Sequence, residues 1–333
     1  MTAKPIIRIE KLVKDFKVPI ENHKKGIFQS IKNIFYKKYE SKTILKGFSF
    51  DIQEGEFVGF IGPNGAGKST TIKMMTGILT PSAGTVEIMG SNPKEKRENY
   101  KHIGVVFGQR SLLEFDISVI ESFKLYKDIY EVSDKDFRER IEYFGKILDI
   151  KTLLDLPVRK LSLGQRMRCE IAAALLHNPK IVYLDEPTIG LDVVAKENIR
   201  HFLKEVNEKF GTTIILTTHD MDDIEQTCQR IIIIDEGDII YDGSLRGFNK
   251  EYLAYKTIEL DYEHITDKQA FTKFLKEREI LLEEKNKVHF KVFQDENKNT
   301  LIKKLLNMVE IKDIAIHQPR LESAIKEIYQ KEK

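Results

Sequence analysis

The strongest chemical signal in the 333-residue sequence is the stretch GPNGAGKST, which lies between an apolar strand pattern and an apolar-periodic helix pattern. Glycines let a backbone wrap closely around phosphates, and the N–H groups of a helix N-terminus point at their oxygens. Lys68 can neutralise β- and γ-phosphates, and Ser69 can ligate Mg²⁺. We therefore expect the chain to bind a nucleoside triphosphate. The predicted phosphate-binding residues are Gly62, Pro63, Asn64, Gly65, Ala66, Gly67, Lys68, Ser69 and Thr70.

Two acidic residues end a second apolar stretch, IVYLDEP. We expect Asp185 at the carboxyl edge of a parallel sheet, where ligands of α/β proteins bind, and its carboxylate can hold Mg²⁺ directly or through water. Glu186 faces differently and can polarise an attacking water as a general base. An acidic turn at a strand end is the ordinary alternative, but beside a phosphate loop the catalytic interpretation is favoured.

Two further polar residues follow predicted strands. Gln109 ends GVVFGQ and His219 follows TTIILTT. Gln109 can reach the metal or the lytic water, and His219 can donate a hydrogen bond to a γ-phosphate. Taken alone, each is more often an ordinary loop residue whose polar atoms are satisfied locally.

The stretch LSLGQRMR predicts a helix start. Ser162 and Gln165 have the spacing of a capping box, in which each side chain bonds the other residue's backbone N–H. Gly164 stands in the first turn, where glycine costs about 1 kcal/mol against alanine. The unfavourable glycine raises the alternative that this helix start is also a binding surface.

In this order, the phosphate loop, Gln109, LSLGQ, YLDEP, IGLD and His219 resemble the ATP-binding cassette (ABC) family of ATPases over about residues 5–245. The resemblance implies that Gln109 contacts the metal site and relays to a membrane partner. It implies that His219 is the switch histidine and that Asp192 belongs to a loop at a dimer seam. It also implies a signature that contacts the γ-phosphate of the opposite subunit. The signature residues are Ser162, Leu163, Gly164 and Gln165, with Leu163 where glycine is usual.

The family's fold is a phosphate-loop α/β core of RecA type with an antiparallel β subdomain and a helical subdomain. We expect this nucleotide-binding domain over residues 1–247, with the helical subdomain near 110–165. Beyond it, 248–333 predicts a small α+β domain, with strands near 256–261, 287–293 and 310–316 alternating with helices.

The resemblance also places an aromatic residue on the adenine. Phe16 matches that residue, although Tyr36 or Tyr39 can serve instead and Phe16 can be a core residue. A basic insertion at about 18–42 separates Phe16 from the phosphate loop, and its apolar and lysine spacing predicts an amphipathic cationic helix at 26–39. Such a helix is either a solvated surface element or a contact with anionic lipid or a permease.

The composition describes a globular chain that is 41% hydrophobic and 32% charged, and its net charge of +2 disfavours a surface devoted to nucleic acid. Two cysteines, Cys169 and Cys228, form no disulfide framework and fit a reducing cytosol. No apolar run approaches the ~20 residues of a membrane helix. We therefore expect a peripheral protein at the cytoplasmic side of the cell membrane.

The combined expectation is an ATPase that uses ATP and Mg²⁺ and drives export of an unknown substrate through separate membrane permease subunits. Since the chain has one phosphate loop and one signature, a second ATPase subunit is expected, with ATP holding a homodimer together. No nucleic acid partner is expected. The alternative is a cassette ATPase acting on the ribosome or on nucleic acid, for which the basic insertion is the only support.

Overall fold

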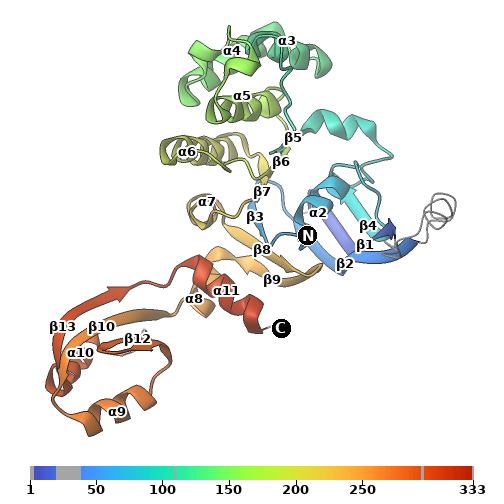
Figure 1. Ribbon diagram of the computed structural model, residues 1–333. Helices are drawn as coiled ribbons and strands as arrows, with labels where there is room; N and C mark the ends of the chain where they lie inside the picture. Colours follow the sequence, from blue (N-terminus) through green and yellow to red (C-terminus); the bar gives the residue numbers. More distant parts are fainter. Residues whose placement is uncertain (1–3, 20–38, 109, 294–295, 332–333) are drawn as a thin grey trace, which may run out of the picture. The chain divides into compact units, whose positions relative to one another are not determined.

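The computed structural model describes residues 4–19, 39–108, 110–293 and 296–331 (Figure 1). The chain divides into two compact units, Met1–Gly243 and Ser244–Lys333, each with a hydrophobic core of its own. The second unit begins just before helix α8 (Leu245–Tyr252), so a boundary after residue 247 falls inside that helix.

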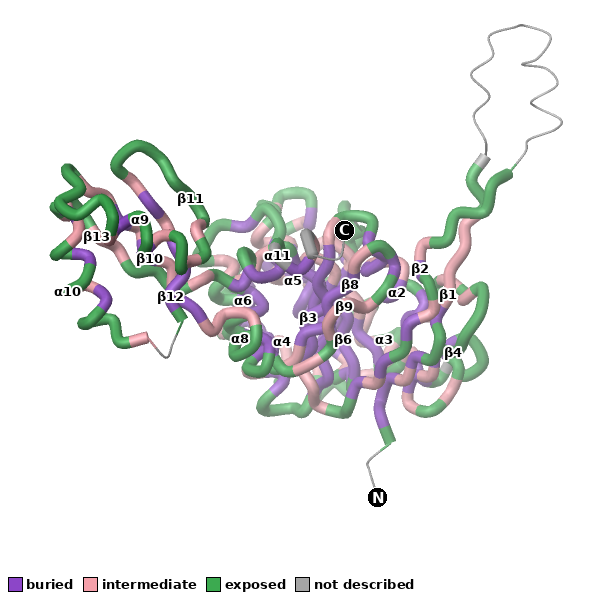
Figure 2. Tube along the Cα trace, turned by 90° about the horizontal axis from the view of Figure 1, so that it is seen from below, coloured by how far each residue is buried: buried purple, intermediate pink, exposed green. Residues whose placement is uncertain are grey.

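The first unit is built on a six-stranded sheet of order β5–β6–β7–β3–β8–β9. Its strands are β3 (Phe57–Ile61), β5 (Ile103–Phe107), β6 (Ile181–Asp185), β7 (Thr213–Thr217), β8 (Arg230–Asp235) and β9 (Asp238–Ser244). From β5 to β8 the neighbours pair in parallel. Their Val-, Ile- and Leu-rich sequences are almost wholly buried, as strands covered on both faces require (Figure 2). The carboxyl ends of β3, β6 and β7 therefore meet at one edge, where the polar residues that follow them gather.

A smaller antiparallel sheet of order β2–β1–β4 packs against the same core. Its strands are β1 (Ile7–Pro19), β2 (Tyr39–Ile52) and β4 (Ala83–Ile88). Helix α2 (Lys68–Met75) contributes Ile72, Met74 and Met75 to a cluster shared with both sheets. Strands β1 and β2 stay paired as far as Pro19 and Tyr39, so strand structure enters both ends of the expected insertion. The helix expected at 26–39 lies, apart from Tyr39, outside the described residues.

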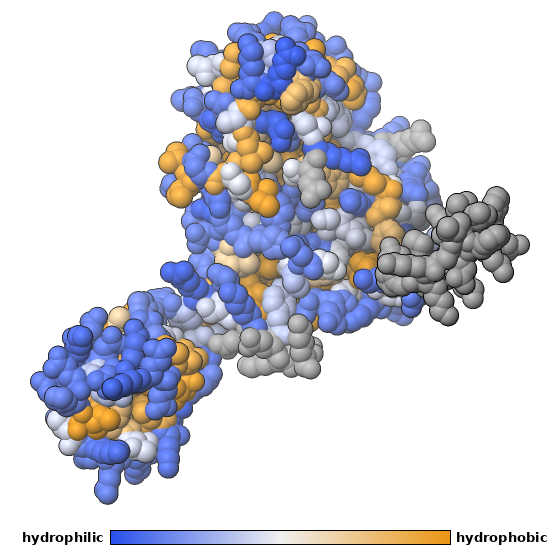
Figure 3. Space-filling model, in the orientation of Figure 1, coloured by the Kyte–Doolittle hydropathy of each residue, from blue (hydrophilic) through white to orange (hydrophobic). Residues whose placement is uncertain are grey.

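Helices form the rest of the first unit. They are α3 (Val119–Ile129), α4 (Asp134–Ile147), α5 (Leu163–Leu175), α6 (Val193–Phe210) and α7 (Met221–Thr227), with 3₁₀ turns at Arg97–His102, Lys151–Leu153 and Val158–Lys160. Hydrophobic side chains lie among hydrophilic ones on the surface of α3–α5 (Figure 3). The exposed apolar residues of α3–α5 and the segments beside them are Phe115, Ile117, Leu125, Ile129, Leu156 and Leu163. In the described part of the chain, no helix combines the length and the apolar character that crossing a bilayer requires.

The second unit has the expected α+β character. After α8 come β10 (Tyr255–Ile265), α9 (Lys268–Lys276), β11 (Ile280–Glu284), β12 (Lys287–Phe293), α10 (Lys298–Met308), β13 (Val309–His317) and α11 (Leu321–Lys331). The sheet is antiparallel with order β11–β12–β10–β13, a split βαβ arrangement of the ferredoxin-like type. Phe271, Phe274, Leu301 and Leu305 pack α9 and α10 onto it. Strand β11 is not among the predicted strands, because this edge strand is mostly exposed and lacks an apolar alternation.

Both cysteines are buried free thiols. Burial raises the pKa of Cys169 and of Cys228 to about 12. Each therefore stays protonated at physiological pH and behaves as a small core residue.

Candidate nucleotide site

The phosphate loop leaves β3 at its carboxyl end and enters α2 at Gly67. Gly67 has a φ of 112°, in the left-handed region that favours glycine, and a Cβ there would lie 2.3 Å from Leu45 Cδ2. A Cβ at Gly62 would lie 2.3 Å from the backbone oxygen of Ile234 on β8. The packing of this chain therefore requires glycine at both positions. Among the described residues no side chain caps α2, so its first N–H groups are available to phosphate oxygens.

The Lys68 side chain folds back over the phosphate loop. Its Nζ donates hydrogen bonds to the backbone oxygens of Gly62 at 2.6 Å and Pro63 at 3.1 Å. Burial lowers the pKa of Lys68, and the nearby carboxylates of Glu186 and Asp185 partly oppose that shift. A phosphate chain at the loop would add negative charge beside this ammonium group and stabilise its charged form.

Asp185 ends β6 beside the phosphate loop. Its Oδ1 accepts hydrogen bonds from Ser69 Oγ at 3.2 Å and from Thr217 Oγ1 at 2.6 Å. A serine hydroxyl and a carboxylate are hard oxygen ligands of the kind that Mg²⁺ prefers. Within the described residues no group of three or more His, Cys, Asp or Glu side chains is arranged to hold a metal. The pair Ser69–Asp185 therefore fits Mg²⁺ whose other ligands are phosphate oxygens and water.

Glu186 and His219 face each other at the same sheet edge. Glu186 Oε1 lies 3.1 Å from His219 Nε2, with 21% of the glutamate side chain exposed and 47% of the histidine's. The backbone of Glu186 has a φ of 57°, an uncommon value for a non-glycine residue, and its N–H donates to the Thr217 oxygen at 3.0 Å. Burial raises the pKa of Glu186, and the neighbouring His219 and Lys68 partly oppose the shift. A carboxylate with a raised pKa is a better proton acceptor, which suits a general base.

The structure confirms the capping box at the start of α5. Ser162 Oγ accepts from the Gln165 N–H at 3.2 Å, and Gln165 Oε1 accepts from the Ser162 N–H at 2.9 Å. Both side chains therefore already have a role inside this chain, and the signature stretch is the N-terminus of a well-formed helix.

The surroundings of Leu163 and Gly164 are not explained by helix capping alone. Leu163 is 43% exposed, and its Cδ2 would lie 2.9 Å from a Cβ at Gly190, so the leucine packs on the following loop of the same chain. A Cβ at Gly164 would meet Leu191 at 3.7 Å and Ala195 at 3.8 Å, which are ordinary contacts. The chain itself therefore has room for a side chain at Gly164 and gives no reason for the glycine.

Asp192 caps the next helix. Its Oδ1 accepts from the Ala195 N–H at 2.8 Å at the start of α6. Three apolar side chains around it are exposed, at Ile189, Val193 and Val194. They lie in the same stretch as Gly190 and Leu191, which are beside Leu163 and Gly164 of the signature helix.

The remaining expected site residues lie apart from this group or outside the described residues. Gln109 and Tyr36 belong to the part of the chain that is not described. Phe16 lies on β1, half-buried, with Lys14 Nζ 5.1 Å from its ring centroid, and Tyr39 is exposed at the start of β2. The adenine contact stays a prediction.

Sequence reasoning missed a set of hydroxyl and charged side chains behind the site. Thr217 joins Asp185 to the backbone of Glu186, and a buried carboxylate, Asp223, is bonded to Thr188, Thr218 and Arg200. The available signal was the threonine pair that ends TTIILTT, since polar side chains are uncommon at the end of a fully buried strand.

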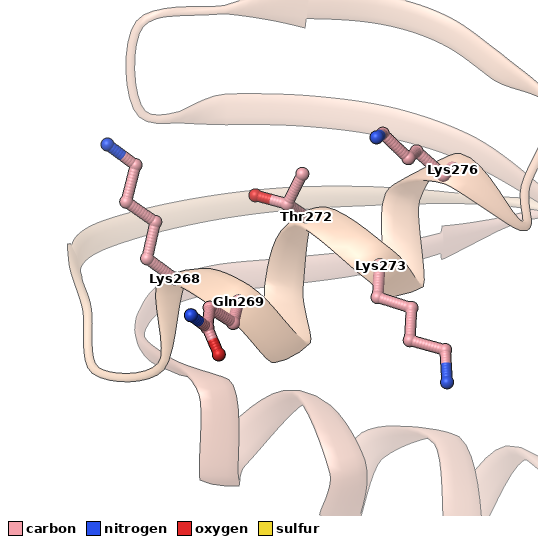
Figure 4. A pocket seen from close by; sticks show the side chains of 5 residues that line it. All are labelled: Lys268, Gln269, Thr272, Lys273 and Lys276. Atoms are coloured by element: carbon pink, nitrogen blue, oxygen red, sulfur yellow. The ribbon is translucent and has the colours of Figure 1, made fainter.

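A hollow of about 490 Å³ occurs in the second unit, where five α9 side chains line it (Figure 4). The lining residues are Lys268, Gln269, Thr272, Lys273 and Lys276. All come from one helix, and Lys273 points to the opposite side of that helix from Lys268, Thr272 and Lys276. Three ammonium groups and a threonine hydroxyl with no acid or carboxylate base in the lining form no catalytic arrangement, so among the described residues the nucleotide site is the candidate site.

Comparison with known proteins agrees with this geometry. The model of the ABC transporter family matches residues 45–189. Nod factor export ATP-binding protein I from Burkholderia thailandensis is 34% identical over 225 residues, which cover 67% of this chain and 73% of that protein. An uncharacterized ABC transporter ATP-binding protein of Bacillus subtilis, YhcH, is 36% identical over 63% of this chain and 68% of its own.

Solved structures give the same answer for the fold. A dimeric ATP-binding cassette in a post-hydrolysis state with ADP and Pi bound has a TM-score of 0.60 and 29% identity, over 72% of this chain and 99% of its own. The cbiO1 cassette from Clostridium perfringens has a TM-score of 0.59 and 29% identity, over 75% of this chain and 92% of its own. The chain belongs to the ABC transporter family. It is an ATP-binding subunit and an ATPase.

Proposed function

We propose that this ATPase drives export through separate permease subunits and that two copies close around ATP during each cycle. The observation that carries the proposal is the convergence of Lys68, Ser69, Asp185, Glu186 and His219 at one sheet edge. Those five side chains supply a phosphate-binding cation, two metal ligands, a base and a hydrogen-bond donor, which together make up a phosphoryl-transfer site.

In the proposed cycle the loop N–H groups and Lys68 hold the β- and γ-phosphates. Ser69 and Asp185 would hold Mg²⁺, which neutralises charge on the phosphate oxygens when bound. Glu186 accepts the proton of the attacking water. His219, 3.1 Å from Glu186 on the exposed side, orients that carboxylate and donates to the γ-phosphate. Gln109 is proposed to contact the metal site.

The signature half of the site is proposed to act in trans. Ser162, Gly164 and Gln165 lie at a helix N-terminus whose dipole suits an anion. Gly164 has room for a side chain within its own chain, so its glycine is explained by the close approach of a second chain's nucleotide. Asp192 and the exposed Ile189, Val193 and Val194 are proposed to line the seam between the two copies.

Three observations support export with a separate permease. The relatives named above include a Nod factor export protein, and the second unit is α+β. Exposed apolar side chains on α3 and the segments beside it offer a surface for a permease. The proposed location is the cytoplasmic face of the cell membrane, held there by the permease.

The catalytic roles are tested with Glu186→Gln. We expect this variant to keep ATP binding and to accumulate as an ATP-bound dimer, with turnover lowered at least ~1,000-fold because the amide accepts no proton. Gel filtration with and without ATP and a phosphate-release assay measure both quantities. Near-normal turnover would show that Glu186 is not the base.

The transport assignment is tested by isolating the intact complex from membranes and identifying the proteins that co-purify. A multi-span membrane protein in stoichiometric amount is expected. Co-sedimentation with ribosomes in place of such a partner would support the alternative class of ABC ATPase.

A further inference from the structure

A buried carboxylate, Asp223 on α7, connects two loops of the site without reaching the nucleotide region itself. Its Oδ2 accepts hydrogen bonds from Thr188 Oγ1 and from Thr218 Oγ1, the latter at 2.8 Å. Thr188 is two residues beyond Glu186, and Thr218 immediately precedes His219. All three bonded residues are at least 97% buried, so water does not compete for these bonds.

The charge of Asp223 is compensated from α6. Arg200 Nε donates to Asp223 Oδ1 at 2.5 Å, and Arg200 Nη2 donates to Asp220 Oδ2 at 3.3 Å. Lys196, one turn earlier, donates to the same Asp220 oxygen at 2.6 Å. Helix α6 begins at Val193, so the histidine loop and the start of α7 are tied both to the loop after Glu186, through Thr188, and to α6, through Lys196 and Arg200.

The hydrogen bonds from Thr188 and Thr218 to Asp223, here called the Asp223 bridge, matter because strand pairing in the sheet ends before these loops. Ladder pairing between β6 and β7 ends at Asp185 and Thr217, and Glu186 and His219 are carried on the loops beyond. Apart from the Glu186–His219 contact itself and the Glu186 N–H bonds to Thr217, the described hydrogen bonds that join the two loops are those through Asp223. A buried ion pair such as Asp223–Arg200 contributes little net stability by itself, so we expect its role to be fixing the relative position of the two loops.

We propose that Asp223 is a positioning residue for ATP hydrolysis, whose carboxylate holds the Glu186 loop and the His219 loop at the spacing that brings those two side chains together. This inference rests on the proposed roles of Glu186 and His219. Because catalysis depends steeply on placement, loosening either loop lowers the rate of the chemical step while leaving ATP binding at the phosphate loop intact.

The test removes one hydroxyl at a time from the full-length chain, with Thr188→Val and Thr218→Val. Thr227→Val is the matched control, because Thr227 Oγ1 donates to the backbone oxygen of Asp223 at 2.6 Å and is equally buried but contacts neither loop. We expect each test variant to lower kcat about tenfold with KM for ATP changed less than about twofold, whereas the control changes neither by more than about twofold.

Two further variants separate positioning from simple loss of stability. Thr188→Ser keeps the hydroxyl and is expected to restore kcat. The double variant T188V/T218V is expected to lose about as much kcat as either single variant, because either substitution already breaks the Thr188–Asp223–Thr218 link between the two loops. Losses that multiply, or test variants that behave like Thr227→Val, would overturn the inference.

The same assay includes Glu186→Gln and His219→Ala. If these two keep turnover, the proposed catalytic roles fail. If they lose turnover while T188V and T218V stay normal, only the positioning role of Asp223 fails.

Discussion

Glycines occur both in the phosphate loop and in the signature stretch at the start of α5, and different causes explain them. At Gly62 an added Cβ would lie 2.3 Å from a backbone oxygen of the same chain, and at Gly67 the backbone has a left-handed φ. At Gly164 the nearest atoms to an added Cβ are 3.7 Å away and the helix would gain from alanine. The phosphate-loop glycines are explained by intrachain packing, whereas the signature glycine is not.

This difference between the glycines bears on whether one chain or two supply the contacts of each half of the site, the phosphate-loop half and the signature half. In a single chain, Ser69 of the phosphate loop is already bonded to Asp185 and His219 contacts Glu186, and Thr217 joins Asp185 to the backbone of Glu186. The signature helix is fully capped and carries an unexplained glycine beside exposed apolar side chains. The phosphate-loop half is therefore built by the fold of one chain, and for the signature half we propose contact with a second molecule.

The largest effect is expected from Gly164→Asp. If the signature acts in trans, an added carboxylate repels the phosphate chain and occupies its space, so ATPase activity falls at least ~100-fold. ATP binding to the single chain should stay within a fewfold of the original, because the phosphate loop is untouched. Phosphate release and binding of a fluorescent ATP analogue measure the two quantities.

Complementation sharpens the same comparison. Mixing the Gly164→Asp chain with a Lys68→Ala chain produces heterodimers that contain one intact phosphate loop facing one intact signature. We expect the mixture to hydrolyse ATP faster than either variant alone. Full activity of Gly164→Asp by itself would mean that the start of α5 is only a helix start.

Gly62→Ala is expected to have the next largest effect, on both folding and binding. The methyl group overlaps the Ile234 backbone, so we expect a loss of about 1–3 kcal/mol in unfolding free energy and a weaker affinity for ATP as the loop shifts. Gly164→Ala is the matched control, with a gain of up to ~1 kcal/mol from helix propensity. Denaturant unfolding of both variants measures the difference. Equal stability losses would remove the contrast between the two glycines.

An intermediate effect is expected from pH. Burial raises the pKa of Glu186, and below that pKa the protonated carboxyl cannot accept a proton from water. As the pH falls through this raised value, kcat should drop about tenfold per pH unit, beginning above the pH at which an exposed glutamate titrates. Circular dichroism at each pH checks that the chain stays folded. An acid limb that persists in Glu186→Gln would assign the titration to another group.

Local sequence patterns predict much of this site because short stretches determine it. The phosphate loop depends on its own glycines and the adjoining strand and helix, and the capping box depends on two residues three apart. Asp185 and Glu186 follow directly from a buried strand. In each case the pattern that predicts the residue lies within a few neighbouring positions of the chain, so local spacing carries the information.

The Asp223 bridge could not be predicted in the same way. It joins Thr188, Arg200, Thr218 and Asp223, which come from a loop, two helices and a strand end. Their meeting depends on how α6 and α7 pack, and single threonines or acids in helices carry no signal of that. Edge strand β11 was missed for a related reason, since exposed strands lack the apolar alternation that marks buried ones.

The smallest effect is expected from Leu163→Gly, which gives the signature the residue usual at that position. Leu163 is 43% exposed and packs on Gly190 of its own chain, so its removal loosens the contact between the signature helix and the following loop. A second glycine in the first turn costs about 1 kcal/mol of helix stability. We expect kcat to change no more than about threefold, because Ser162 and Gly164 keep the N–H groups in place. Steady-state ATPase measurements test this, with Leu163→Met as the control that keeps the contact. A loss as large as that of Gly164→Asp would mean that the Leu163 side chain itself contacts the phosphate. The contrast between Leu163, which packs on its own chain, and Gly164, which is proposed to face a second chain, would then be wrong.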